Sequence, residues 1–434
     1  METSMENIKM ERYPEYRNSG ENWLGEVPAN WELTRLGTRF FERRTKVSDK
    51  DYAPLSVTKQ GILPQLDSAA KTNDGDNRKL VKAGDFVINS RSDRKGSSGI
   101  SNLDGSVSLI NIVIEPKGIN PIFCNYLFKS NGFIEEFYRN GHGIVADLWT
   151  TRYDEMKAIK IAIPSKFEQT RIAAFLDQKT TQIDQSIAQK ERLIELLKER
   201  RQILIHNAVT RGLNPNVRMK DSGVEWIGEV PEGWEVKRLK HVTTKIGSGI
   251  TPSGGGTSYL DEGIPLLRSQ NVLFGKIEFE GVAFISEKIH SEMSNSQVKN
   301  GDVLLNITGG SIGRCHFVEV DFPINVNQHV CIVRPSKSIS TVFLNAILAS
   351  EIGQGQIWFF QQGGGREGLN FQALKSFFIP LPPVKEQIAI SEQIKTVTNK
   401  IATAIACKQA EIEKLKEYKA TLINSAVTGK IKIA

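Results

Sequence analysis

The sequence predicts an α+β protein in which two mixed α/β domains are separated by two long helices. These helices are expected to pair as an antiparallel coiled coil within a pseudo-twofold internal repeat. Three observations support this: one segment recurs along the chain, two long helical stretches recur in the same way, and short strand-like runs lie between them. Strands and helices that occupy separate stretches of a chain are typical of α+β folds.

Length and composition are those of an ordinary globular protein with more than one domain. The chain has 434 residues, of which 39% are hydrophobic and 24% are charged. These values argue against wholesale disorder, a collagen-like structure and a disulfide scaffold. Lys and Arg number 56 against 49 Asp and Glu, which gives a net charge of +7. This excess permits a polyanionic partner without establishing one.

Nothing in the sequence indicates a membrane protein or a secreted one. No apolar run approaches the roughly 18 residues that span a bilayer, and the polar opening METSMENIKMERY lacks the apolar core of a signal peptide. The cysteines form no close C-x-x-C pair, so we expect reduced thiols in an intracellular protein. They are Cys124, Cys315, Cys331 and Cys407.

The repeat is the most informative feature of the sequence. SGENWLGEVPANWELTRL at 19–36 returns 203 positions later as SGVEWIGEVPEGWEVKRL at 222–239, with 11 of 18 positions identical. Composition alone gives about one or two identities. Two further segments, at 161–172 and 204–210, return 218 positions later, so the second copy carries 15 extra residues between its matched ends.

The inserts between the matched ends diverge. Their one faint correspondence is KAGDFVINS at 82–90 beside KNGDVLLNI at 299–307. One interpretation is a shared frame that holds two different recognition modules. The alternative is a tandem duplication whose inserts have drifted and are purely structural.

Each insert is followed by a long stretch with helical periodicity and a heptad seam. Residues 168–210 contain no Gly or Pro, and Gly212 and Gly429 stand where the two helices are expected to end. Cationic residues interrupt both seams in the same register, and polar seam residues can fix register and partner. The predicted seam residues are Leu176, Ile183, Ile187, Ile194, Leu197, Leu204, Ile394, Ile401, Ile405, Ile412, Leu415 and Leu422.

A helix of about 43 residues is on the order of 65 Å long, which exceeds one small domain. A narrow seam kept over several heptads favours helix pairing, so we interpret the helices as a spacer. The alternative is an ordinary packing helix in each domain.

Loops in both inserts contain the residue types that contact DNA. Arg can bind guanine through two hydrogen bonds, and Asn or Gln can do the same with adenine. Any one of these side chains could equally be an ordinary solvated one. The candidates are Lys59, Gln60, Arg91, Arg94 and Lys95 in the first insert, and Arg268, Ser269, Gln270, Asn271, Ser311, Arg314 and Arg366 in the second.

No catalytic or metal-binding constellation is visible. The glycine-rich segments at 247–259 and 361–368 lack the GK[ST] ending of a P-loop and the context of a dinucleotide fingerprint. Cys315, His316, His329 and Cys331 suggest zinc, but neighbours on a strand point to opposite faces, so buried thiols are the better prediction. The Glu235 to Lys237 pair lies inside the repeated block, where a structural role explains it. We therefore expect no catalytic residue, metal or cofactor in this chain.

The repeated blocks resemble the specificity subunit of type I restriction-modification systems. The resemblance rests on SG-x-x-W-[LI]-GEVP-x-x-WE-x-x-RL before each insert and on IPLPPVKEQIAI leading into the second helix. It spans nearly the whole chain. The first linker keeps Pro164, Glu168 and Gln169 but lacks the second Pro, which leaves open a different geometry where the first helix starts.

The resemblance implies a non-catalytic subunit that binds double-stranded DNA in a prokaryotic cytoplasm. Each target-recognition domain would bind one half of a bipartite asymmetric sequence, and the paired helices would set the gap. Two methyltransferase subunits and the restriction subunits, which carry translocase and nuclease activity, would be the partners. These partners would use S-adenosylmethionine, ATP and Mg. The implied order is recognition domain 1 (1–165), central helix (166–212), recognition domain 2 (213–382) and C-terminal helix (383–434).

Other functions stay open on the sequence alone. The chain could serve a complex that methylates DNA without a nuclease, and neighbouring genes would distinguish that case. It could be a DNA-modifying enzyme with cryptic motifs, which activity of the chain alone would reveal. It could also be a coiled-coil assembly protein indifferent to DNA, for which DNA binding would be weak and insensitive to salt.

Overall fold

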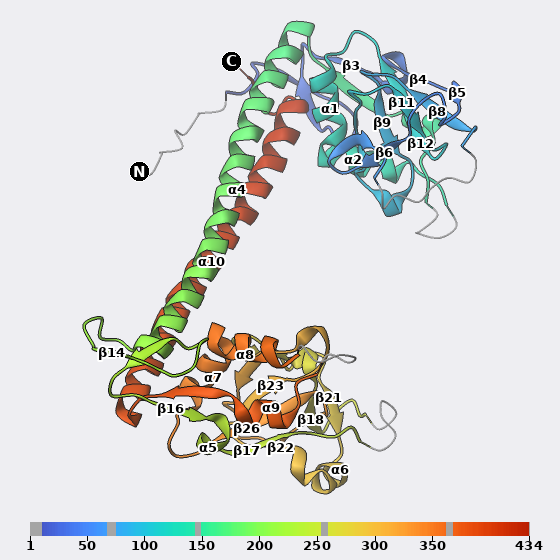
Figure 1. Cartoon of the computed structure of the whole chain (residues 1–434). Coiled ribbons are helices and arrows are strands. Elements are labelled where there is room, and N and C mark those ends of the chain that lie inside the picture. The colour runs from blue at the N-terminus through green and yellow to red at the C-terminus, as the bar shows by residue number, and fades with distance from the viewer. Residues whose placement is uncertain (1–10, 67–74, 144–148, 253–258, 362–367, 434) are drawn as a thin grey trace. The chain divides into compact units, whose positions relative to one another are not determined.

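The computed structural model (Figure 1) describes residues 11–66, 75–143, 149–252, 259–361 and 368–433. The chain forms two compact units: unit 1 contains Met1–Glu191 and Gln409–Ala434, and unit 2 contains Arg192–Lys408. Each unit mixes strands with helices, and one long helix follows each insert, so the predicted α+β fold class is confirmed. In the described part of the chain, no helix is long and apolar enough to cross a membrane.

A four-stranded antiparallel sheet forms the centre of unit 1. Its strands, in spatial order, are β10 (Ser98–Ile100), β9 (Phe86–Asn89), β12 (Asn111–Pro116) and β4 (Phe40–Glu42). Successive strand residues point to opposite faces. Phe86 and Ile88 therefore pack with the helices α1 (Pro121–Lys129) and α2 (Asn131–Arg139), whereas Val87 packs with the second layer of strands.

Unit 2 repeats this arrangement strand for strand. Its central sheet has the order β24 (Cys315–Phe317), β23 (Val303–Asn306), β26 (Val330–Pro335) and β17 (Thr243–Ser248). The helices α7 (Thr341–Ala349) and α8 (Glu351–Gln361) cover Val303 and Leu305, and Leu304 faces the other way. The faint sequence match between 82–90 and 299–307 thus corresponds to one structural position, since it contains β9 and β23.

The two units differ mainly in their outer strands. Unit 1 has the sheet β11 (Gly105–Val107), β8 (Arg78–Val81) and β5 (Lys46–Val47), and the hairpin β6 (Leu55–Thr58) and β7 (Gly61–Pro64). Unit 2 has the sheet β21 (Ala283–Ile285), β18 (Ile264–Leu267), β25 (Ile324–Val326) and β22 (Gln297–Val298), and the hairpin β19 (Val272–Leu273) and β20 (Lys276–Ile277). The remaining short helices are α3 (Tyr153–Met156), α5 (Leu239–Val242), α6 (Glu287–Glu292) and α9 (Phe371–Ser376).

The recurring segments before and after each insert lie side by side. In unit 1, β3 (Glu32–Arg35) pairs with β13 (Lys160–Ile163), and in unit 2, β16 (Glu235–Arg238) pairs with β27 (Phe378–Leu381). The small hairpins β1 (Tyr16–Asn18) with β2 (Glu26–Pro28) and β14 (Met219–Asp221) with β15 (Glu229–Pro231) also correspond. The repeated sequence therefore forms the same structure twice, at the place where an insert meets its long helix. We call this structure the joint.

A buried tryptophan ties each joint to the first turn of a long helix. The indole N–H of Trp31 donates to the carboxylate of Glu168 at 3.2 Å, and that of Trp234 donates to Glu386 at 3.1 Å. A carboxylate is favourable there because the helix dipole places partial positive charge at the N-terminus. Gln169 and Gln387 both donate to a proline carbonyl five residues earlier, at 3.0 Å and 2.9 Å. The two helices therefore start in the same way despite the missing second Pro.

The same joints also receive a helix C-terminus. Helix α10 (Val384–Val427) ends in unit 1 and α4 (Lys166–Arg211) ends in unit 2. Gly429 and Gly212 follow them with φ of +73° and +71°, so the predicted helix ends are confirmed. A Cβ at Gly429 would lie 2.3 Å from Cδ of Pro28. A Cβ at Gly212 would lie 2.8 Å from Oε1 of Glu386 and 3.2 Å from Cζ2 of Trp234, so both helix ends pack closely against their joints.

The predicted seam is buried or half-buried in both helices, with one exception. Leu204 is 36% exposed, and Ile205 packs against the core of unit 2 in its place. The placement of Leu204 on the seam is therefore wrong. A straight helix has 3.6 residues per turn and drifts by about 20° per heptad against a strict repeat of 3.5, which moves the contact to the next residue after several heptads.

The cationic seam residues contact acids on the facing helix within unit 1. Lys190 pairs with Glu411, and Lys419 pairs with Asp184 at 2.7 Å. The two contacts run in opposite directions along the helices, so the segments are antiparallel there. Because each pair joins one residue of α4 to one of α10, the pairs favour a single register.

Candidate DNA interface

Three candidate arginines, Arg91, Arg94 and Arg314, lie on loops at the same place in the two central sheets. In unit 1 the loop after β9 passes through a 3₁₀ turn, Ser92–Arg94, and in unit 2 the loop after β23 passes through Gly309–Ser311. Matching backbone bonds close the loops: Asn89 N–H donates to the Ser97 carbonyl and Asn306 N–H to the Arg314 carbonyl, both at 2.9 Å. We name them the unit 1 loop (90–97) and the unit 2 loop (307–314).

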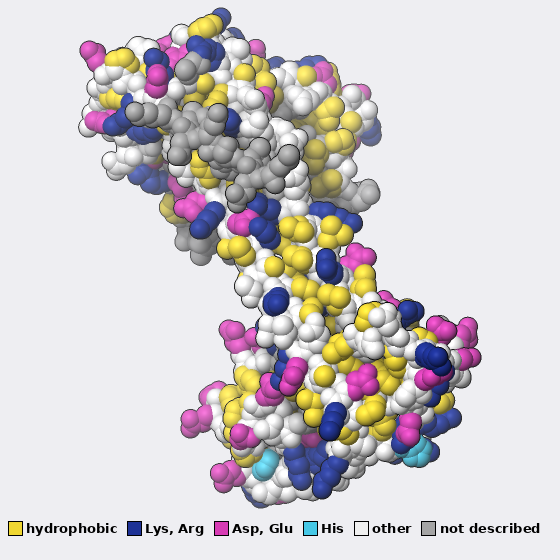
Figure 2. Space-filling view, turned by 90° about the vertical axis from the view of Figure 1, so that its left-hand side faces the viewer, with side chains coloured by type: hydrophobic (Ala, Val, Ile, Leu, Met, Phe, Trp, Pro, Cys, Tyr) yellow, Lys and Arg dark blue, Asp and Glu magenta, His cyan; other side chains and the backbone are white. Residues whose placement is uncertain are grey.

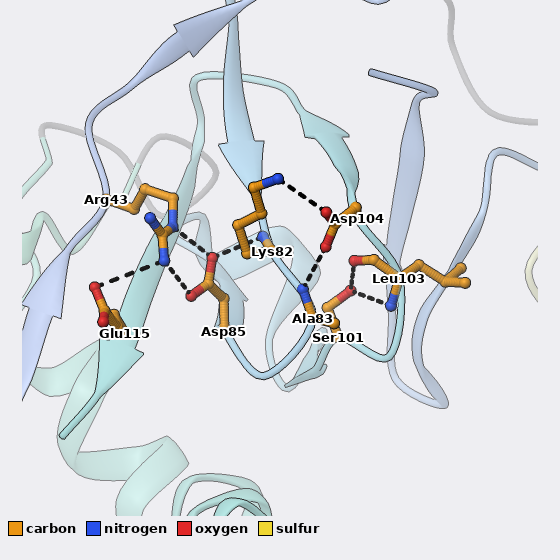
Figure 3. A network of polar contacts seen from close by, with 8 residues as sticks. All are labelled: Arg43, Lys82, Ala83, Asp85, Ser101, Leu103, Asp104 and Glu115. Atoms are coloured by element: carbon orange, nitrogen blue, oxygen red, sulfur yellow. Dashed lines mark hydrogen bonds and ion pairs between the residues drawn. The ribbon is translucent and has the colours of Figure 1, made fainter. Parts of the chain in front are cut away.

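A buried salt bridge fixes the opposite end of the strand that carries each loop. In unit 1, Arg43 donates to both carboxylate oxygens of Asp85, at 2.7 Å and 2.9 Å (Figure 3). In unit 2, Arg334 makes the same two contacts with Asp302, both at 2.7 Å. These hydrogen bonds raise the pKa of both arginines, so they remain charged. Arg43 follows β4 whereas Arg334 lies in β26, so the same anchor is built from different strands.

The unit 1 candidates differ in how available they are. Arg94 extends into solvent, with 70% of its side chain exposed. Arg91 is half-buried and its backbone pairs with Thr150. The ammonium of Lys95 contacts Glu135 of α2 at 2.6 Å, so binding a phosphate would require it to leave that partner.

Lys59 and Gln60 lie apart from the unit 1 loop. They are exposed on the turn between β6 and β7, where the Lys59 carbonyl accepts a hydrogen bond from Lys129 at 3.0 Å. Gln60 lines a cavity of about 410 Å³ that also contains Asp177 of α4. The structure therefore does not gather all five unit 1 candidates at one place.

In unit 2 the structure brings two candidate groups together. The Asn306 side chain, at the start of the unit 2 loop, donates to the carbonyls of Ser269 and Val272 at 2.7 Å and 3.2 Å. This ties the 3₁₀ turn Ser269–Asn271 to the loop that carries Ser311 and Arg314.

Within that turn, Gln270 is exposed, and Arg268 lies 5.8 Å from the centre of the Tyr259 ring. The prediction of Asn271 as a DNA contact is wrong. Asn271 is 1% exposed, accepts from the Arg268 N–H at 3.0 Å and donates to the Glu278 carbonyl at 3.0 Å, so its amide holds the turn together. Arg366 lies outside the described residues.

Sequence analysis missed a polar chain beside the unit 2 loop. Thr308 is 2.6 Å from Nδ1 of His329, and Nε2 of that ring is 3.1 Å from the Gln328 amide, which also bonds Thr251. The polar run NVNQH was the only available signal, because the contacts depend on how β25 and β26 bring this turn to the loop.

The cysteines behave as core residues. Cys315 and Cys331 are buried beneath the helices of unit 2, and burial raises the pKa of both thiols to about 12. Cys124 is buried as well and Cys407 is exposed, and none of the four forms a disulfide. Reduced thiols stay a prediction. Within the described ranges, no three His, Cys, Asp or Glu side chains gather as a metal site would require.

Repeated joints, paired helices and two sets of polar loops are the features on which the comparison with known proteins rests. The family model described as "Type I restriction modification DNA specificity domain" matches residues 231–414. The chain is therefore similar to the specificity subunits of type I restriction-modification systems, as the repeated blocks of its sequence indicated.

Among its relatives is the type I restriction enzyme MjaVIII specificity subunit of Methanocaldococcus jannaschii, which is 29% identical over 94% of each chain. The EcoBI specificity subunit of Escherichia coli is 28% identical over 54% of this chain and 50% of its own.

Solved structures share the fold. A chain from a structure of the type I R-M system, described for complex assembly and conformational transition, superimposes with a TM-score of 0.69 at 17% identity, covering 92% of this chain and 98% of that one. The crystal structure of the HsdS subunit from Thermoanaerobacter tengcongensis gives a TM-score of 0.54 at 17% identity, with 93% and 98% covered.

Proposed function

We propose that this chain recognises a bipartite, asymmetric DNA target, with one unit bound to each half-site, and that it does no chemistry itself. It would act in the cytoplasm within a type I complex, bound to two methyltransferase subunits and to restriction subunits. The observation that carries the proposal is the identical order of central strands beneath loops of unlike composition. One scaffold with two different contact surfaces suits a target with two unlike halves.

The long helices would set the gap between the half-sites. Helix α4 has 46 residues, so at ~1.5 Å per residue it is about 69 Å long. Half-sites one to two turns of DNA apart are separated by about 35–70 Å, a comparable length. Both ends of this helix are tied to buried side chains, at Glu168 and at Gly212, which supports a rigid spacer.

An exposed apolar stripe on α4 offers a docking surface for a methyltransferase subunit. Leu193, Leu196, Ile203 and Leu204 are 41%, 44%, 49% and 36% exposed and lie on a flank of the helix away from the seam. Figure 2 shows hydrophobic side chains gathered along the part of the long helices that joins unit 2. An apolar stripe of this kind is unusual for a helix that faces only water.

The division of labour can be tested by exchanging inserts. Replacing residues 37–160 with the insert of another specificity subunit should change one half of the methylated motif and leave the other half and the gap unchanged. The reciprocal replacement of 240–378 should change only the other half. If either exchange altered both halves, or neither, the assignment of one half-site to each unit would be wrong.

Docking is tested separately with charged substitutions. Leu196→Asp together with Ile203→Asp should reduce recovery of the methyltransferase subunit in a co-purified complex. Ala188→Asp, an exposed position on the opposite flank of the same helix, is the matched control and should leave recovery unchanged. Equal recovery for both variants would place the docking surface elsewhere.

A further inference from the structure

The last two strands of the recognition core are joined by one short turn in each unit. In unit 1 the turn 108–110 joins β11 to β12, and in unit 2 the turn 327–329 joins β25 to β26. The first residue of the following strand donates its N–H back to the turn in both cases, from Asn111 to Ser108 at 3.0 Å and from Val330 to Asn327 at 3.2 Å. The turns are therefore equivalent residue by residue.

Strand register places both turns next to the loops of the candidate interface. Asn111 pairs with Asn89, and Val330 pairs with Asn306. Asn89 and Asn306 are the last strand residues before the unit 1 loop and the unit 2 loop. Whatever approaches either loop also meets the neighbouring turn.

The two turns carry opposite chemistry at matching positions. In unit 1 the exposed middle residue is Leu109, 42% exposed, followed by a half-buried Ile110. In unit 2 the exposed middle residue is Gln328, followed by a half-buried His329. Leu109 is therefore available for contact at the tip of its turn, next to the unit 1 loop.

Leu109 lies at a cavity whose lining carries more cations than acids. It shares a cavity of about 430 Å³ with Ser90 of the unit 1 loop and with a surplus of cations, namely Arg44, Lys46, Lys79 and Arg152 against Glu42 and Asp154. Glu42 pairs with Arg44 at 2.6 Å and with Lys79 at 3.2 Å, and Asp154 pairs with Lys157 outside the lining at 2.6 Å, so the net charge of the lining stays positive. Lysine and arginine side chains around Leu109 can bind DNA phosphates while the leucine contacts the edge of a base. The same cations would add little to the binding of an apolar protein surface.

The polar turn of unit 2 is held ready for a base. The ring of His329 bonds Thr308 at 2.6 Å and Nε2 of Gln328 at 3.1 Å, and Oε1 of Gln328 accepts from Thr251. These contacts position the exposed amide beside the unit 2 loop and leave one hydrogen on Nε2 and one lone pair on Oε1 for a base. A glutamine amide can donate to N7 of adenine and accept from its N6 amino group, which is a base-specific pair of bonds.

We propose that this turn is a specificity determinant in both units, which rests on the proposed function. Leu109 contacts the C5-methyl group of one thymine in the half-site bound by unit 1. Gln328 bonds the major-groove edge of one adenine in the half-site bound by unit 2. The same position of one scaffold thus selects a methyl group in one half and a hydrogen-bonding edge in the other.

The thymine contact is tested by removing only the methyl group. Each thymine of the mapped target is replaced in turn by deoxyuridine, and binding by the complete complex is measured. One replacement in the unit 1 half-site should weaken binding about fourfold, the effect of one buried methyl group. With Leu109→Ala, that same replacement should have no effect. Leu103→Ala, a leucine of similar exposure (39%) at the other end of β9, is the control and should keep the fourfold effect.

The adenine contact is tested in the same way with 7-deazaadenine, which lacks the N7 acceptor. One replacement in the unit 2 half-site should weaken binding by the wild-type complex about tenfold, within the range for one base-specific contact. Gln328→Ala should abolish the sensitivity at that position and leave the deoxyuridine effect in the other half-site intact.

Several results would overturn the inference without touching the proposed function. A bipartite target in which no thymine is coupled to Leu109, or no adenine to Gln328, would remove the turn from recognition. If Leu109→Ala left DNA affinity unchanged but reduced recovery of a partner subunit, the turn would be a protein contact. Failure of the proposed function would look different, because the wild-type complex would then show no bipartite target at all.

Discussion

Replacing Gly429 with alanine tests the joint between the end of α10 and unit 1. The glycine has φ of +73°, where an L-residue costs roughly 1–2 kcal/mol. Its new Cβ would also lie 2.3 Å from Cδ of Pro28 and 3.3 Å from Cη2 of Trp31. Pro28 is buried in β2, so relieving the clash should cost about 1–3 kcal/mol more, as in other overpacked cores.

Gly20→Ala supplies a matched control in the same unit. Gly20 has φ of +72°, but a Cβ there would meet no atom within 4 Å, so this variant reports the backbone cost alone. Urea unfolding of the full-length chain, followed by tryptophan fluorescence, compares the two variants under the same conditions. Gly429→Ala should be less stable than Gly20→Ala by about 1–3 kcal/mol. A difference below about 0.5 kcal/mol would refute the close packing of the helix end against Pro28 and Trp31.

Three further predictions concern the anchor, the seam and the loops. Asp302→Asn should lower the free energy of unfolding by about 3 kcal/mol. This is the low end for breaking a buried ion pair, because the side chain of the partner Arg334 is 22% exposed. A loss below about 1 kcal/mol in thermal denaturation would contradict the prediction. Ile187→Asp with Ile405→Asp should loosen the helix pair and reduce methyltransferase docking in size-exclusion chromatography, and unchanged complex formation would count against the seam. Arg91→Ala and Arg268→Ala should weaken recognition of opposite half-sites by about 1–3 kcal/mol in binding assays, whereas equal losses on unrelated sequences would make them phosphate contacts.

The joints and the long helices were predictable because the segments that form them occur twice in the sequence. In both copies a tryptophan bonds a helix-start glutamate, and a glycine after the other helix packs closely against that tryptophan, which leaves little freedom for substitution. The seam of α10 followed from its heptads for the same reason. Leu204 failed because heptad counting assumes a repeat of 3.5 residues per turn over the whole length, whereas the helix contact shifts to Ile205.

The interface was less predictable because loop chemistry does not reveal where a side chain points. Asn271 has an amide that could bond adenine, but this amide already makes hydrogen bonds with backbone groups of Arg268 and Glu278. Leu109 and Gln328 escaped notice, and His329 was considered only as a zinc ligand, because their positions depend on strand pairing between segments about 20 residues apart in the chain. Only the folded sheet brings these turns to the loops.

The most direct test of the central claim is a map of methylated bases in DNA from cells that carry the complete system. The proposed function predicts two unlike sequence elements separated by a fixed stretch of unspecified bases, one element for each unit. A continuous motif, a palindrome, or two elements at variable separation would contradict this account.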